Sequence, residues 1–147
     1  MIFESFSQDN TEEFGRKMGQ AATAGEVYCL IGDLGAGKTA FARGFARGLG
    51  VLDDITSPTF AIVNEYSGRL ALSHFDVYRI NDVTEMEDTG YEDYFYGDGV
   101  TLVEWADMVE ELWPPGAVVV RIERDAAGDD DFRRIVVERA RYEYFGH

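Results

Sequence analysis

The sequence predicts an α/β fold in which one mixed β-sheet lies between helices and carries antiparallel additions. Short apolar runs typical of buried strands alternate with stretches whose apolar side chains recur about every 3.6 residues, as in helices. One apolar run leads directly into a glycine-rich loop, and a helical pattern follows that loop. The 147 residues have the length of one domain, so we expect a single domain over residues 1–147.

In the first half of the chain, residues 2–6 indicate a short strand, and residues 10–23 indicate a helix with one apolar face. The apolar run 26–31 indicates a buried strand, and a helix from about 38 to 49 follows the glycine loop. Residues 59–66 and 70–78 alternate apolar and polar side chains. The Ser67-Gly68 turn between these two segments predicts a hairpin.

In the second half, residues 82–96 indicate helical pieces rich in acids and tyrosine. The run 100–104 indicates another buried strand, and residues 106–112 a short helix that ends before two consecutive prolines. The segments 117–123 and 133–140 alternate strongly enough to predict a final pair of strands.

The segment FARG-FARG, residues 41–48, repeats with a spacing of four and therefore predicts a helix with distinct faces. Phe41 and Phe45 lie on one face, and Gly44 and Gly48 on another. Each glycine costs about 1 kcal/mol of helix propensity, so their presence indicates close approach to a neighbouring element, most simply the sheet.

The composition restricts the possible partners and location. Twenty-eight acidic residues against thirteen basic ones give a net charge of −15, which disfavours tight autonomous binding of tRNA or other nucleic acid. An acidic surface serving solubility and an acidic face for a basic partner both remain open. We expect no membrane segment and no secretory signal, hence a cytoplasmic protein in which the single cysteine, Cys29, is a reduced core residue.

The glycine-rich loop has the form of a phosphate-binding loop. GDLGAGKT, residues 32–39, fits G-x-x-x-x-G-K-[ST] and lies between a predicted strand and a predicted helix. Its backbone N–H groups and the helix N-terminus favour phosphate, Lys38 would reach the β and γ phosphates, and the Thr39 hydroxyl would ligate Mg²⁺. The only other lysine is Lys17. The sequence therefore predicts a P-loop NTPase-like fold, and the absence of an N-K-x-D string favours ATP over GTP.

Two carboxylates are candidates for metal binding and for orienting water. Glu104 ends the apolar run 100–104, and Asp76 ends the segment LALSHFD in the same manner. Ligands of open α/β sheets gather at the carboxyl ends of strands, so both acids are candidate catalytic and metal-binding residues. The alternative for each residue is an ordinary surface acid at the end of a strand.

Other polar and aromatic residues have a structural and a functional interpretation. The segment Ser57-Pro58-Thr59 could sense the γ phosphate or simply form a capped turn into a strand. For His74 a place in the core or at an edge is favoured over catalysis. Trp105 and Trp113 could stack on a base or a partner, although core packing is the default interpretation.

Four motifs together are similar to a known family. GDLGAGKTAFARGFARGLG, SPTFAIVNEY, HFDVYR and LVEW, in this order and spacing, resemble TsaE, the bacterial ATPase family of the tRNA threonylcarbamoyladenosine pathway. The motifs extend from Gly32 to Trp105, and the N-terminal helix with Thr11 fits the family as well. The resemblance covers about two thirds of the chain, whereas the tail after Trp113 matches only in strand pattern.

The resemblance implies an ATP and Mg²⁺ site. Thr39 and Glu104 would hold the metal, Asp76 would support the metal or the attacking water, and the segment from Gln8 to Thr11 would approach the nucleotide. The phosphates would be wrapped by Leu34, Gly35, Ala36, Gly37, Lys38 and Thr39.

The family's role is to support threonylcarbamoylation of the adenosine beside the anticodon, in tRNAs that read codons beginning with A. It acts through the TsaB–TsaD transferase complex. The alternatives are a P-loop small-molecule kinase, which would usually carry arginines in a lid, and a nucleotide-gated binding module with negligible turnover. Residues 82–96 contain no arginine, which disfavours the kinase.

Overall fold

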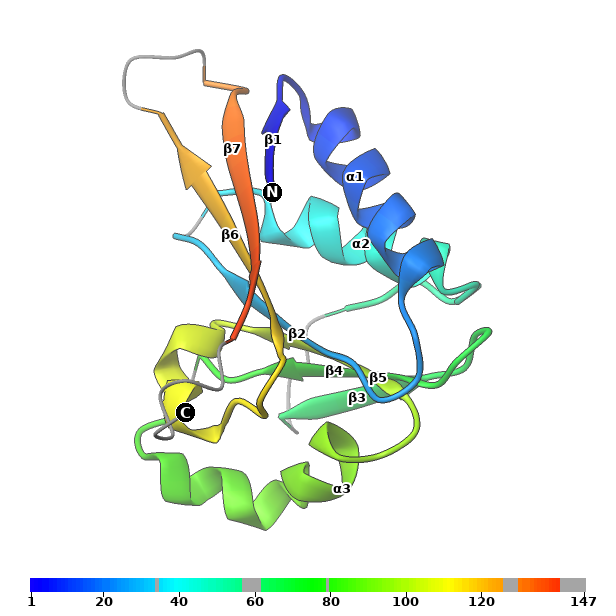
Figure 1. The fold of residues 1–147 in the computed structure, drawn as a ribbon, viewed down its shortest axis with the longest axis vertical. Coiled ribbons are helices and arrows are strands. Elements are labelled where there is room, and N and C mark those ends of the chain that lie inside the picture. Colours follow the sequence, from blue (N-terminus) through cyan, green and yellow to red (C-terminus); the bar gives the residue numbers. More distant parts are fainter. Residues whose placement is uncertain (34, 57–61, 79, 126–129, 141–147) are drawn as a thin grey trace.

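The structure, a computed structural model, describes residues 1–33, 35–56, 62–78, 80–125 and 130–140. Within these residues the chain forms one seven-stranded sheet of order β1-β7-β6-β2-β5-β4-β3 (Figure 1). The strands are β1 (Ile2–Ser5), β2 (Val27–Ile31), β3 (Val63–Tyr66), β4 (Leu72–Asp76), β5 (Val100–Glu104), β6 (Val118–Arg124) and β7 (Arg133–Arg139). The central strands β6, β2, β5 and β4 are parallel, and β1, β7 and β3 are antiparallel to their neighbours. The predicted mixed sheet, the β3–β4 hairpin and the final strand pair are confirmed.

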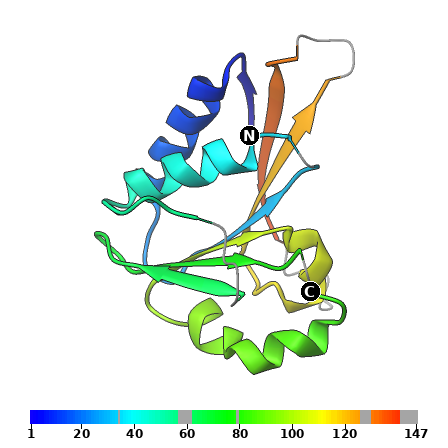
Figure 2. The same cartoon turned by 180° about the vertical axis from the view of Figure 1, so that it is seen from behind.

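Helices cover both faces of the sheet (Figures 1 and 2). On one face lie α1 (Gln8–Ala21) and α2 (Lys38–Gly48), and on the other lie η1 (Val83–Thr89), α3 (Tyr91–Phe95) and η2 (Ala106–Leu112). Each face has its own apolar core. The described residues contain no helix that is both long and apolar enough to cross a membrane.

The two cores use the strand residues in alternation. In β5, Leu102 points to the α1 and α2 side, whereas Val103 points to the opposite side with Phe75 of β4. Cys29 of β2 is fully buried in this second core, as expected, and burial raises the pKa of its thiol to about 12. The thiol is therefore a packed apolar group and not a reactive one.

The interior glycines of α2 face α1, so the expectation that they approach the sheet is wrong. A Cβ on Gly44 would lie 1.9 Å from the carbonyl oxygen of Glu12, and a Cβ on Gly48 would lie 2.1 Å from that of Arg16. The sheet side of α2 instead carries the fully buried rings of Phe41 and Phe45. Bulky apolar side chains pack on the sheet, while the glycines allow two helical backbones to touch.

Helix α1 begins at Gln8, two residues before the predicted start. Ser7 is the N-cap, and its side chain accepts a hydrogen bond of 3.0 Å from the backbone N–H of Asn10. A buried hydrogen bond of 2.7 Å joins the hydroxyls of Ser5 and Thr11 and fixes the helix to the end of β1. The N-terminus of α1 lies beside the glycine-rich loop, since a Cβ on Gly37 would be 3.8 Å from Cγ2 of Thr11.

Candidate functional site

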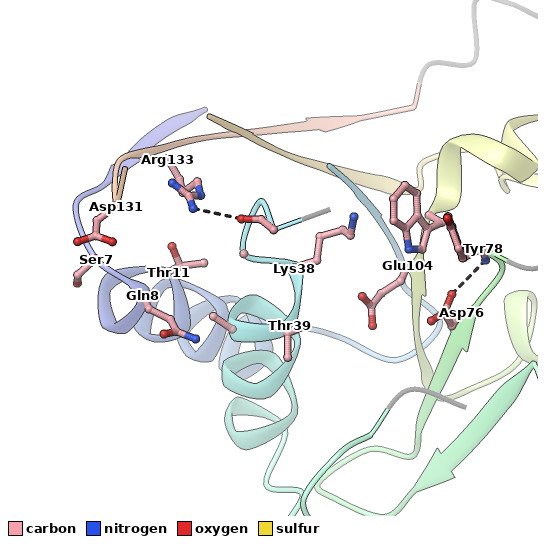
Figure 3. Close-up of a pocket in the computed structure, with 14 residues that line it drawn as sticks. Ser7, Gln8, Thr11, Lys38, Thr39, Asp76, Tyr78, Glu104, Asp131 and Arg133 are labelled. Carbon is pink, nitrogen blue, oxygen red and sulfur yellow. Dashed lines mark hydrogen bonds between the residues drawn. The ribbon is translucent and has the colours of Figure 1, made fainter. Parts of the chain in front are cut away.

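A cleft of about 560 Å³ opens at the carboxyl ends of the parallel strands (Figure 3). Its walls come from the N-termini of α1 and α2, the ends of β4 and β5, and the start of β7. Eight of the residues predicted for the site line it: Gln8, Thr11, Gly35, Gly37, Lys38, Thr39, Asp76 and Glu104. Ala36 is buried behind the loop, and Leu34 and the segment Ser57-Pro58-Thr59 lie outside the described residues.

The glycine-rich loop has the backbone that its sequence predicts. Gly35 and Gly37 adopt φ values of 77° and 107°, which disfavour any side chain. Gly37 is the N-cap of α2 and offers no side chain to the first N–H groups of the helix. These N–H groups and the positive end of the helix dipole are therefore directed toward the cleft, where an anion would be stabilised.

Lys38 is a buried cation that lines this cleft, and the residue is only 7% exposed. Its ammonium donates to the carbonyl oxygens of Gly32 and Asp33, and it lies 3.5 Å from the ring centroid of Trp105. Burial lowers the pKa of Lys38, although nearby carboxylates, of which Glu104 has the largest effect, oppose that shift. An anionic ligand in the cleft would compensate this buried charge.

Asp76 and Glu104 are direct neighbours in the parallel register of β4 and β5, so the two predicted carboxylates do come together. One oxygen of each is already held. The backbone N–H of Tyr78 donates to Oδ1 of Asp76 at 3.0 Å, and Nε2 of His74 lies 2.6 Å from Oε2 of Glu104. Figure 3 shows both acids facing Thr39 and Lys38 across the cleft.

Trp105 follows Glu104 with a φ of 61°, the one positive value for a non-glycine residue in the described part of the chain. This left-handed backbone is costly for a bulky residue and turns the indole over Lys38 and against the ring of Tyr78. Trp113, by contrast, packs against the second core and donates to the carbonyl oxygen of Ala106 at 2.9 Å. The default interpretation of core packing is correct for Trp113 and incomplete for Trp105.

Arg133 is the site residue that sequence reasoning missed most clearly. Its Nε–H donates to the carbonyl oxygen of Ala36 at 2.8 Å and an Nη2–H to that of Gly35 at 3.2 Å. Ser7, Tyr78 and Asp131 also line the cleft without having been predicted. No local sequence pattern indicates that Arg133 belongs to the site. Its place beside the loop depends on how β7 pairs with β6 in the folded sheet.

The residues of the cleft fit a magnesium nucleotide. In the described ranges no group of three or more His, Cys, Asp or Glu side chains could hold a metal alone. Thr39, Asp76 and Glu104 supply oxygen atoms only, and Mg²⁺ prefers one or two protein oxygens together with phosphate and water. The loop N–H groups and Lys38 supply the positive potential that phosphates need.

Fold and cleft together define the class of protein: an α/β protein built on one mixed sheet, whose candidate site lies at the carboxyl ends of the parallel strands. Comparison with family models gives a match to "Threonylcarbamoyl adenosine biosynthesis protein TsaE" over residues 5–135. The chain belongs to the TsaE family. The resemblance inferred from the four motifs is therefore confirmed, and it extends well into the C-terminal strands.

Individual relatives agree with this assignment. The tRNA threonylcarbamoyladenosine biosynthesis protein TsaE of Bacillus subtilis is 45% identical over 130 residues, covering 88% of this chain and 80% of the relative. The protein of the same name from Treponema pallidum is 39% identical, with 85% and 93% covered. The crystal structure of Bacillus subtilis YdiB superimposes with a TM-score of 0.76 at 38% identity, covering 99% of this chain and 88% of that one.

Proposed function

We propose that this chain is a Mg²⁺-dependent ATPase that supports formation of threonylcarbamoyladenosine in tRNA. The observation that carries the proposal is the convergence of Lys38, Thr39, Asp76 and Glu104 on one cleft at the start of α2. A phosphate loop alone would account for binding. The two adjacent carboxylates are the additional feature that hydrolysis requires.

In this proposal the loop N–H groups bind the phosphates, and Lys38 moves from its carbonyl partners to the β and γ oxygens. Mg²⁺, when bound, would neutralise the charge that develops on the transferred phosphoryl group. Thr39 and Glu104 would hold the metal, and Asp76 would orient the attacking water or support the metal. Gln8 at the N-terminus of α1 lines the same cleft and would contact the rest of the nucleotide.

We further propose that the chain acts in the cytoplasm through the TsaB–TsaD transferase complex. A chain with a net charge of −15 is poorly suited to bind tRNA alone, so tRNA would be bound by the partners. Reconstitution of tRNA modification over many turnovers, with and without this chain, tests the role. Tight, salt-sensitive binding of tRNA by the isolated chain would contradict this division of labour.

The ATP site is tested by two substitutions. Lys38→Ala is expected to abolish nucleotide binding, whereas Glu104→Ala should retain part of the binding and lose turnover, because it removes a metal ligand and not the phosphate cradle. Lys17→Ala on the exposed side of α1 is the matched control and should behave as wild type. Titration with a fluorescent ATP analogue and release of inorganic phosphate measure the two properties. Normal hydrolysis by Glu104→Ala would refute its assignment.

Release of inorganic phosphate also separates this proposal from the kinase alternative. In an ATPase, phosphate release equals ATP consumption, whereas a kinase would transfer the phosphoryl group to a metabolite and release none. An assay that follows both quantities in the presence of a metabolite mixture distinguishes the two activities.

A further inference from the structure

His74 is a buried histidine that the proposed mechanism does not use. It lies on β4, two residues before Asp76, and its side chain is only 2% exposed. Its Nε2 is 2.6 Å from Oε2 of Glu104, whose own side chain is 9% exposed. This is a buried side-chain hydrogen bond between two neighbouring strands, and it reaches directly to a residue of the candidate site.

The environment of the other ring nitrogen identifies the donor. Nδ1 of His74 is buried and has no hydrogen-bond partner among the described residues. A proton on Nδ1 would therefore be a buried N–H group without an acceptor, which is rare and costly in folded proteins. The tautomer with its proton on Nε2 avoids this and gives Glu104 a charge-assisted hydrogen bond.

We propose that His74 is a positioning residue, whose Nε2–H holds Oε2 of Glu104 so that the carboxylate presents only Oε1 to the cleft. Asp76 has the equivalent arrangement, because the backbone N–H of Tyr78 holds its Oδ1. In the part of the chain that the structure describes, each of the two adjacent acids thus has one oxygen bound by the protein and one available. Partners of this kind orient metal-binding carboxylates and restrict them to one geometry.

The functional part of this inference rests on the proposed ATPase activity and is tested with a pair of variants of similar shape. His74→Gln retains an N–H donor near the position of Nε2, whereas His74→Met lacks it. We expect His74→Met to lower kcat and to raise the Mg²⁺ concentration for half-maximal nucleotide binding, each by about 10–100-fold. Nucleotide binding without Mg²⁺ should change little, and His74→Gln should recover most of both losses.

A readout independent of activity tests the hydrogen bond itself. The chain has two histidines, so in His147→Ala a long-range ¹H–¹⁵N spectrum contains the imidazole of His74 alone. We expect the pattern of the Nε2–H tautomer and a downfield Nε2–H proton that is lost or shifted in Glu104→Ala. If the wild type neither binds nor hydrolyses Mg-ATP, the proposed function fails, but this spectrum still tests the bond.

Three results would overturn the inference. The first is an Nδ1–H tautomer in the spectrum. The second is wild-type turnover and Mg²⁺ dependence in His74→Met. The third is an equal loss in His74→Gln and His74→Met with thermal unfolding as in wild type, which would show that the donor on residue 74 does not matter.

Discussion

Arg133 connects the C-terminal hairpin to the glycine-rich loop through hydrogen bonds to two loop carbonyls, those of Ala36 and Gly35. Arg133→Met retains a side chain of similar length with an apolar stem, but it leaves these carbonyls without their charged donor. Hydrogen bonds to charged groups contribute about 1.5–3 kcal/mol, so we expect a loss of unfolding free energy of about 1–2 kcal/mol. Nucleotide affinity should fall by about tenfold as the loop loosens. Chemical denaturation and nucleotide titration measure the two effects.

Arg134→Met is the matched control for this prediction. Arg134 is the next residue on β7 and is exposed on the opposite face of the strand. An exposed substitution away from special features changes stability by less than about 0.5 kcal/mol. Equal effects of the two substitutions would mean that the loss of positive charge, and not the contact with the loop, is responsible.

At the residue scale, the sequence predicts those site residues whose role is encoded locally. Lys38 belongs to a contiguous motif, and Asp76 and Glu104 each end an apolar strand, so their chemistry and direction can both be inferred. That His74 pairs with Glu104 could not be inferred, because the adjacency of β4 and β5 is a property of the sheet. Arg133 was missed for the same physical reason.

At the scale of the helices, the glycines of α2 determine how closely α1 can approach. Gly44→Ala would place a methyl group against the carbonyl oxygen of Glu12, at 1.9 Å without relaxation. The helices would have to separate, which we expect to cost about 1–3 kcal/mol of unfolding free energy or more. The loss should appear even though alanine improves helix propensity by about 1 kcal/mol. Denaturant unfolding followed by circular dichroism measures it.

Arg47→Ala is the control on the same helix, because Arg47 is exposed and alanine is again the better helix former. Its stability should stay within about 0.5 kcal/mol of wild type. A Gly44→Ala variant as stable as this control would indicate that α1 shifts without cost, and that the close packing is not required.

The element pattern was more predictable from sequence than the way the elements pack. Each strand in the described residues falls within or beside its predicted segment, because periodicity and turn residues are local signals. The interior glycines of α2 indicated a close approach, but not to which neighbour. That choice depends on the position of α1, which a helix sequence alone does not contain.

At the level of the whole molecule, Glu26 connects the start of β2 to the end of β7. Its carboxylate accepts from the backbone N–H of Thr23, from Tyr28 and from Arg139, the last at 3.0 Å. Burial raises the pKa of Glu26, but these hydrogen bonds outweigh it, so the net pKa is below the usual 4.5. A carboxylate with a lowered pKa in the folded state stabilises the fold above its unfolded pKa.

This stabilisation is present above about pH 4.5 and is lost as the pH falls through the lower pKa of the folded state. Glu26→Gln should therefore be less stable than wild type near pH 7, and the difference should shrink below about pH 4.5. Unfolding free energies from denaturant titrations across this pH range measure it. A difference that stays constant would mean that shape and neutral hydrogen bonds, not charge, account for the role of Glu26.

The net charge of −15 predicts how the stability of the fold depends on salt. Like charges repel more strongly in the compact state, and the Debye length falls from about 30 Å at 0.01 M salt to about 3 Å at 1 M. Salt also weakens exposed ion pairs such as Arg16–Glu13, but isolated exposed pairs contribute little to stability. The relief of repulsion should dominate, so we expect the Tm to rise with NaCl.

Calorimetry in NaCl, KCl and choline chloride tests this prediction. Screening raises the Tm equally in all three salts, whereas binding of a particular cation makes the salts differ. A Tm that falls with salt would mean that attractive pairs outweigh the excess of acids and that the acidic surface does not destabilise the fold.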